Sequence, residues 1–264
     1  MLASLAIDWP LVWSRIVNPN GVFFHALWAT VYISVVAQVL GILLGLLAAL
    51  MRMSKFWPIR LVSSLYVLIF RGTPVIVQIM FLWLVLPLGR TVDLGVITLP
   101  NAVVAGILAL GINEGAYMRE ITRAGIDSID RGQMEAAKSL GMRTGLAMRR
   151  IVLPQAARVI VPPLGNEFNN MMKTSSLLNF IGVYELFADA SQVESTTLKA
   201  GPFIAVAFWY LVLTSIWSVI QALIERKLAV SEHGDEISLR DRAVAIWTEG
   251  GGMVRSAWPW RARA

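Results

Sequence analysis

The sequence predicts an all-α membrane protein with five transmembrane helices, its N-terminus outside and its C-terminus in the cytoplasm. Hydrophobic residues make up 56% of the 264 residues and charged residues only 15%, against about 25% charged residues in ordinary soluble domains. Long apolar segments recur along the chain, and lysines and arginines are alternately scarce and abundant between them. A soluble fold of this length could not bury so much apolar surface.

Apolar segments of roughly 20 residues are long enough to cross a bilayer as helices. The clearest candidates lie at 22–51, 59–88, 97–118 and 203–224. One further segment, 155–184, is only weakly apolar because it contains two prolines and several polar residues. Hydropathy alone would leave that segment in doubt.

The distribution of positive charge resolves the doubt. Outside the spans, successive connecting segments contain one, three, one, eight, one and seven lysines or arginines. Loops rich in these residues lie on the cytoplasmic side of a membrane. Because this alternation requires an odd number of crossings, 155–184 is predicted to be a span, and the 119–155 loop and the chain end are predicted to be cytoplasmic.

Three regions follow from these spans. Residues 1–21 are predicted to be an extracellular or interfacial segment, in which Trp9 and Trp13 favour a helix along the membrane surface. Residues 22–228 are predicted to form the five-helix transmembrane domain. Residues 229–264 are predicted to be a polar cytoplasmic tail that either contacts anionic membrane lipid or is simply disordered.

The composition excludes several classes of protein. The chain has no cysteine, so it has no disulfide framework, no cysteine-based zinc site and no thiol nucleophile. It lacks the G-x-x-x-x-G-K-[ST] loop that cradles ATP phosphates. The net charge of +6 lies in segments that flank the membrane, so no nucleic acid partner is expected.

Two other classes of membrane protein fit these observations less well. An intramembrane enzyme would need H-E-x-x-H, a Ser/His pair or paired intramembrane aspartates, and the sequence has none of them. An ion channel or secondary carrier that works without an ATPase is the alternative function. The absence of a filter-like glycine run and of inverted halves argues against it.

The longest cytoplasmic loop, 119–155, is patterned rather than irregular. Its run Glu-Ala-Ala-Lys-Ser-Leu favours a helix, with Asp130 available as the N-cap and Gly141 as the stop. The adjacent Ala136 and Ala137 leave a smooth, narrow face that the groove of another protein could accept. The alternative is an amphipathic helix that lies on the membrane.

The loop follows the pattern E-A-A-x3-G-x9-I-x-L-P at every position. In this it resembles the EAA loop of permease subunits of binding-protein-dependent ABC importers, and the resemblance spans about 22–228. Other blocks resemble the polar amino acid subfamily, the histidine/glutamine permease type. They are Phe70-Arg71-Gly72-Thr73-Pro74 with Gln78, Gly115-Ala116-Tyr117 with Glu120, Lys173-Thr174-Ser175-Ser176-Leu177, and Val183-Tyr184-Glu185-Leu186.

The resemblance implies a type I ABC importer permease fold and ATP-driven import of polar or charged L-amino acids across the plasma (inner) membrane of a prokaryote. It implies ABC ATPase subunits, a second permease subunit of the same or a homologous chain, and an extracellular amino-acid-binding protein as partners. No cofactor would bind this chain, because ATP and Mg²⁺ bind the ATPase. The residues implied to contact the ATPase are Glu135, Ala136, Ala137 and Gly141.

Polar residues inside the predicted spans mark a candidate substrate site. Arg71 lies about 18 Å into the second span at 1.5 Å per residue, beside a Gly-Thr-Pro sequence that would break the helix. Glu114, in the third span, needs a cationic partner or a proton, and three polar residues of the fourth span share one helix face. The candidate substrate-binding residues are Arg71, Thr73, Glu114, Asn166, Asn170 and Lys173.

Two interpretations of these residues stay open. In the first, Arg71 binds the carboxylate of an amino acid with both ends of its planar fork, Glu114 binds the ammonium, and Asn166 and Asn170 orient the substrate. In the second, Arg71 bonds to carbonyls at the helix break or pairs with Glu114, and the polar face makes contacts only inside the bundle.

Overall fold

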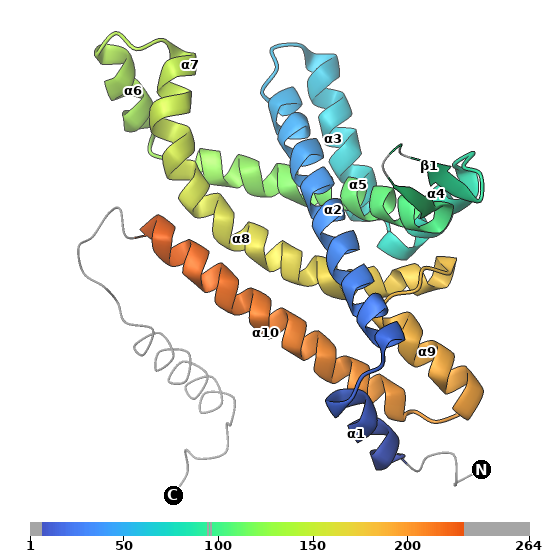
Figure 1. Cartoon of the computed structure of the whole chain (residues 1–264). Helices are drawn as coiled ribbons and strands as arrows, with labels where there is room; N and C mark the ends of the chain where they lie inside the picture. Colours follow the sequence, from blue (N-terminus) through green and yellow to red (C-terminus); the bar gives the residue numbers. More distant parts are fainter. Residues whose placement is uncertain (1–6, 94, 96, 230–264) are drawn as a thin grey trace, which may run out of the picture. The chain divides into compact units, whose positions relative to one another are not determined.

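The computed structural model describes residues 7–93, 95 and 97–229, which are mainly helical (Figure 1). Met1–Ala222 form one compact unit, and the last residues of the final helix belong to a second unit, Leu223–Ala264. The predicted tail falls almost entirely outside the described residues. The elements are α1 (Trp9–Val17), α2 (Gly21–Arg52), α3 (Trp57–Gly72), α4 (Val75–Val85), β1 (Thr91–Asp93), β2 (Thr98–Pro100), α5 (Asn101–Asp127), α6 (Arg131–Ser139), α7 (Thr144–Ala147), η2 (Met148–Val152), α8 (Leu153–Thr174), η3 (Ser175–Ile181), α9 (Leu186–Thr197) and α10 (Gly201–Ala229).

A short antiparallel hairpin of β1 and β2 joins α4 to α5, a feature that the all-α prediction missed. Val92 pairs with Leu99 in its centre. The Gly95 N–H donates to Oδ1 of Asp93 at 2.8 Å, and Gly95 has a φ of +81°. That backbone conformation favours glycine, so a local turn closes two strands that are too short to show a periodic pattern.

Helices α2 and α5 pack against each other more extensively than any other pair of described elements. A Cβ added at Gly45 would lie 2.9 Å from the backbone N of Arg119, and one added at Gly111 would lie 2.6 Å from Cδ2 of Leu40. Small residues allow membrane helices to approach closely. The contact is therefore built on two pairs of glycines spaced four residues apart, Gly41 with Gly45 and Gly111 with Gly115.

The main apolar core forms where α2, α4, α5, α8 and η3 meet. Ile33, Ile79, Leu110 and Leu178 are all buried within it. Lipid tails are as apolar as these side chains, so moving the side chains from lipid into the core gains little free energy from the hydrophobic effect. The core therefore stabilises the bundle mainly through close van der Waals contact. It fixes the positions of α5 and α8 relative to α2 and α4.

The second predicted span is broken at the predicted Arg-Gly-Thr-Pro sequence. Helix α3 ends at Gly72, α4 begins at Val75, and the two helices are bent by 108° relative to each other. Pro74 is the N-cap of α4, and proline favours such a boundary because it has no backbone N–H to continue a helix.

Side-chain amides satisfy the carbonyl groups that the break exposes. Nε2 of Gln78 donates to the carbonyl oxygens of Phe70 (3.0 Å) and Thr73 (3.1 Å). Nδ2 of Asn113 also donates to the Phe70 carbonyl, at 2.9 Å. One interpretation of the sequence had Arg71 bond to the carbonyl groups at this break, and here the amides of Gln78 and Asn113 bond to them instead.

Three of the five predicted spans correspond to helices of the described chain that could cross a membrane. Among the described helices, α2 and α10 are long and apolar enough to cross a membrane, and the bent α3–α4 pair would supply a third span. Helices α5 and α8 occupy most of 97–118 and 155–184, but both carry charged residues that face other helices of the bundle. Five crossings and the sides of the two termini remain predictions.

Polar contacts attach the helix expected within residues 1–21, which is α1, to later parts of the chain. Arg15 pairs with Asp189 of α9. Nζ of Lys199 donates to Oδ2 of Asp8 at 2.5 Å, and this hydrogen bond lowers the pKa of the Asp8 carboxyl. The described part of the N-terminal segment, from residue 7 on, is thus attached to later parts of the chain.

Candidate functional site

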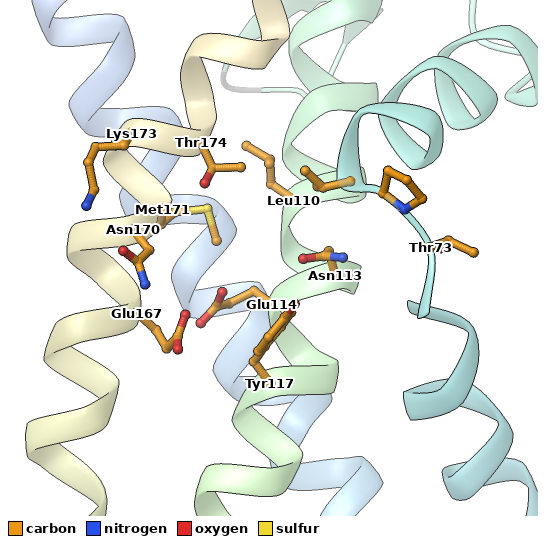
Figure 2. A pocket seen from close by; sticks show the side chains of 12 residues that line it. Thr73, Leu110, Asn113, Glu114, Tyr117, Glu167, Asn170, Met171, Lys173 and Thr174 are labelled. Atoms are coloured by element: carbon orange, nitrogen blue, oxygen red, sulfur yellow. The ribbon is translucent and has the colours of Figure 1, made fainter. Parts of the chain in front are cut away.

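A cavity of about 460 Å³ lies between the start of α4, the middle of α5 and the second half of α8 (Figure 2). We call it the α5–α8 cavity. Its volume falls within the range of small-molecule sites, roughly 300–1,000 Å³. The lining residues are Thr73, Pro74, Val75, Leu110, Asn113, Glu114, Tyr117, Glu167, Asn170, Met171, Lys173 and Thr174.

Glu114 is held on the α5 wall of this cavity with little hydrogen bonding. Its residue is 5% exposed, and Nε2 of Gln38 donates to its Oε1 at 3.2 Å. A Cβ at Gly41 would lie 2.5 Å from its Cγ, so the glycine gives the side chain its space. In the described part of the chain Gln38 is the one hydrogen-bond partner of this carboxyl, which leaves most of its acceptor capacity for a ligand.

A second carboxyl group faces the first across the cavity. Figure 2 shows the side chains of Glu114 and Glu167 pointing toward each other from α5 and α8. Glu167, Asn170 and Thr174 are spaced i, i+3, i+7, so they share one face of α8. Lys173 is exposed and is the one cationic side chain among the described residues that line the cavity.

Two predicted site residues lie outside the lining. The guanidinium carbon of Arg71 lies 5.0 Å from the centre of the Tyr117 ring, as a cation–π contact. Oδ1 of Asn166 accepts a hydrogen bond from Nε2 of Gln221 on α10 at 3.3 Å. The predicted polar face is therefore split, because Asn170 lines the cavity and Asn166 contacts α10.

The structure brings together four of the six predicted site residues and adds others. Thr73, Glu114, Asn170 and Lys173 all line the α5–α8 cavity. The pairing of Arg71 with Glu114, which one interpretation proposed, is not among the contacts of the described residues, since Glu114 bonds to Gln38. The sequence carried a signal for the added polar residues, because each lies one, three or four residues from a predicted one. They are Asn113, Tyr117, Glu167 and Thr174.

The helix predicted in the long loop is α6, with the predicted cap and stop. Oδ1 of Asp130 accepts from the backbone N–H of Gly132. At the other end, the Gly141 N–H donates to the backbone carbonyl oxygen of Lys138 at 2.9 Å. The Met142 N–H donates to the backbone carbonyl oxygen of Ala137 at 3.1 Å. These two bonds form a Schellman motif, and the φ of +80° at Gly141 explains why glycine stands there.

One detail of this helix was predicted wrongly. Ala136 is exposed, but Ala137 is 1% exposed and faces the inside of the loop, because consecutive helical residues are rotated by about 100°. The outer face is instead formed by Glu135 and Ala136, and it continues to Leu140, which is 83% exposed.

A membrane bundle with a polar cavity and a capped loop helix is typical of polytopic transport subunits. The family model described as "Binding-protein-dependent transport system inner membrane component" matches residues 41–230. The chain belongs to this family. It is an inner membrane component of a transport system, not itself an enzyme, and in this family nucleotide binds the ATPase partner.

Relatives and solved structures agree with this assignment. The chain is 39% identical over 233 residues to the arginine transport system permease protein ArgU of Corynebacterium glutamicum, covering 85% of this chain and 73% of ArgU. It is 36% identical over 228 residues to the L-cystine transport system permease protein TcyB of Bacillus subtilis, covering 84% of this chain and 92% of TcyB.

Among solved structures, the chain resembles an amino acid ABC transporter crystallised with histidines. The TM-score is 0.73 at 37% identity, with 84% of this chain and 100% of the other covered. An inward-facing MetNI methionine ABC transporter shares the fold with a TM-score of 0.66 at 17% identity, over 79% of this chain and 96% of the other. The ABC importer permease fold that the loop motif implied is thus confirmed.

Proposed function

We propose that this chain is the permease subunit of an ATP-driven importer for polar or charged L-amino acids, and that the α5–α8 cavity carries the substrate. The relatives named for arginine and L-cystine transport support this substrate class. The cavity supplies the chemistry, since every α-amino acid has an ammonium that needs acceptors and a carboxylate that needs a donor.

The observation that carries the proposal is the pair of carboxyl groups facing each other across the cavity. Glu114 and Glu167 bind the substrate ammonium and any cationic side chain, while the flexible Lys173 reaches the substrate carboxylate. Asn170 and Thr73 supply neutral hydrogen bonds that orient the molecule. Two acids and one base favour substrates with two positive groups and one negative group, the basic amino acids.

Two residues predicted for the site receive different roles. Arg71 acts through Tyr117, which lines the cavity beneath its guanidinium. Asn166 holds α8 to α10 through Gln221 rather than contacting substrate.

The proposal includes a topology and an assembly. The transmembrane domain spans residues 22–228 with five crossings, the 1–21 segment lies outside, and the 119–155 loop and the 229–264 tail lie in the cytoplasm. The alternating lysine and arginine counts support this arrangement. A second permease subunit, identical or homologous, and an extracellular amino-acid-binding protein complete the transporter.

Helix α6 couples this subunit to the ATPase in our proposal. Glu135, Ala136 and Leu140 form the outer face that enters the ATPase groove. Ala137 and Gly141 act from inside, the first by packing the helix onto the loop and the second by ending it. Leu140 is 83% exposed, so it places an apolar side chain on this proposed docking face beside Ala136.

Substrate-stimulated ATP hydrolysis tests the proposed function. The complete transporter, with ATPase, binding protein and lipid, would be assayed with arginine, glutamine and aspartate. We expect stimulation in the order basic, neutral, acidic. Stimulation by aspartate above arginine would contradict the role of the carboxyl pair. Amino acid uptake that needs no ATPase would instead support the channel or secondary-carrier alternative.

A further inference from the structure

A second cavity, of about 400 Å³, lies where the end of α2, the middle of α3 and the second half of α5 meet. We call it the arginine cavity. It shares no lining residue with the α5–α8 cavity, and neither the transport site nor α6 uses it. Its lining residues are Arg52, Ser64, Val67, Arg119, Glu120 and Arg123.

Arg119 is buried on the α5 side of this cavity with an incomplete set of partners. Its residue is 5% exposed, and it pairs with Glu120 through one guanidinium nitrogen. Its Nε is buried and has no hydrogen-bond partner among the described residues. The positive charges of Arg52 and Arg123 act on it from nearby. A buried cation in this state is costly unless an anion completes its bonding.

The acidic residues nearby are already engaged. Glu120 is shared, because Nη2 of Arg123 also lies 3.3 Å from its Oε2. Nη1 of Arg123 lies 2.7 Å from Oδ2 of Asp127. Arg52 makes no ion pair within the described residues. Three arginines against two carboxylates leave a net positive site, and the guanidinium of Arg52 has no acidic partner among the described residues.

The surroundings of the cavity resemble a membrane surface. Phe56 and Trp57 are exposed directly after α2, and aromatic residues gather at the level of lipid headgroups. On α3, Leu61 and Leu68 are exposed and lie three residues before and four after Ser64, so they border the cavity on the helix surface. A basic cavity thus adjoins an apolar stripe.

We propose that the arginine cavity binds the phosphate group of an anionic phospholipid. Arg52 and Arg119 bind the phosphate oxygens, since guanidinium forks suit phosphate geometry, and the acyl chains lie along Leu61 and Leu68. Basic cavities between membrane helices on the cytoplasmic side are typical headgroup sites. The cytoplasmic leaflet as the location rests on the proposed topology, whereas the preference for anionic lipid does not.

Native mass spectrometry of the purified transporter tests the proposal. The protein would be titrated in detergent with phosphatidylglycerol and phosphatidylcholine in equal amounts. We expect one phosphatidylglycerol per permease chain to bind in preference to phosphatidylcholine. The variant Arg52→Gln should weaken that binding about fivefold, because a cationic group near anionic lipid contributes about that much. Lys55→Gln removes a nearby charge outside the cavity and should weaken binding less than Arg52→Gln does.

A second variant and a second ligand keep the test decisive if Arg52→Gln is unstable. Glu120→Gln removes a negative charge from the lining and should strengthen phosphatidylglycerol binding. Equal binding of the two lipids by wild-type protein, or weaker binding in Glu120→Gln, would overturn the proposal. Displacement of phosphatidylglycerol by millimolar inorganic phosphate would show that the cavity binds free phosphate, and would overturn the proposal that its ligand is a phospholipid. None of these measurements depends on transport, so failure here is distinct from failure of the proposed function.

Discussion

Two glutamates buried in the bundle have contrasting hydrogen bonding, and the contrast separates a structural role from a functional one. Glu185 accepts bonds from the backbone N–H groups of Phe187 (2.9 Å) and Ala188 (2.8 Å) and from the Tyr210 hydroxyl (2.9 Å). Glu114 accepts one, from Gln38. A carboxylate with three strong donors is fully used by the fold, whereas one with a single amide donor retains capacity for a ligand.

Glu185, the glutamate with the full set of hydrogen bonds, should be important for stability. Glu185→Ala removes the N-cap of α9 and leaves two backbone donors unsatisfied, at about 1–3 kcal/mol each. Tyr210→Phe removes one donor and should cost about 1.5–3 kcal/mol. Thermal unfolding in detergent should therefore show a larger decrease in Tm for Glu185→Ala than for Tyr210→Phe. An unchanged Tm in Glu185→Ala would contradict the structural role.

At the scale of helices, the α2–α5 contact depends on the absence of side chains at its glycines. Gly45→Ala places a Cβ 2.9 Å from the Arg119 backbone N and 3.0 Å from the Gly115 carbonyl oxygen. Backbone atoms cannot turn aside, so we expect a loss of about 1–3 kcal/mol in the free energy of unfolding. Gly21→Ala, in the same helix with nothing within 4 Å of the added Cβ, is the matched control. Equal stabilities of the two variants would show that the contact is looser than described.

The end of α6 allows a similar comparison for coupling. Gly141 and Gly145 both have open space around an added Cβ, but only Gly141 of the two has a positive φ, of +80°. Gly141→Ala should strain or unwind the end of α6, at about 1 kcal/mol or more, and so reduce ATP-driven uptake several-fold. Gly145→Ala should leave uptake near wild type. Normal uptake by Gly141→Ala, with the ATPase still bound, would argue against coupling through this helix end.

Over the whole molecule, several features of the helices with local causes were predictable from the sequence. The break at Thr73 and Pro74, the Asp130 cap and the Gly141 stop depend on residues within a few positions of each other. The sequence did not predict which side of each helix faces the cavity. Asn166 and Asn170 are equivalent by helical spacing, yet only the positions of α5 and α10 decide which of them lines the cavity.

The site was predicted in part for the same reason. Glu114 was identified because a carboxylate in an apolar segment is conspicuous. Arg71 was equally conspicuous, but it lies at the end of α3 with its guanidinium over Tyr117 and is not among the lining residues. The arginine cavity escaped prediction because Arg52 and Arg119 are far apart in sequence and meet only through the α2–α5 contact.

The proposed topology makes a direct prediction for the intact cell. Because the chain has no cysteine, single cysteines can be introduced without background. A cysteine at Ser195 should react with a membrane-impermeant maleimide from outside. A cysteine at Ser139, on α6, should react only after permeabilisation. The reverse pattern would invert the proposed orientation, and labelling of both from the same side would contradict five crossings.

The central claim is that the α5–α8 cavity carries the amino acid, and ATP-dependent uptake of labelled arginine into proteoliposomes tests it most directly. The complete transporter would be compared with its Glu114→Gln and Asn166→Ala variants, with assembly and basal ATP hydrolysis measured alongside. Loss of one charged contact should lower uptake by Glu114→Gln about 10- to 100-fold, while Asn166→Ala stays near wild type because that residue lies outside the lining. Wild-type uptake by an assembled Glu114→Gln transporter would contradict the account.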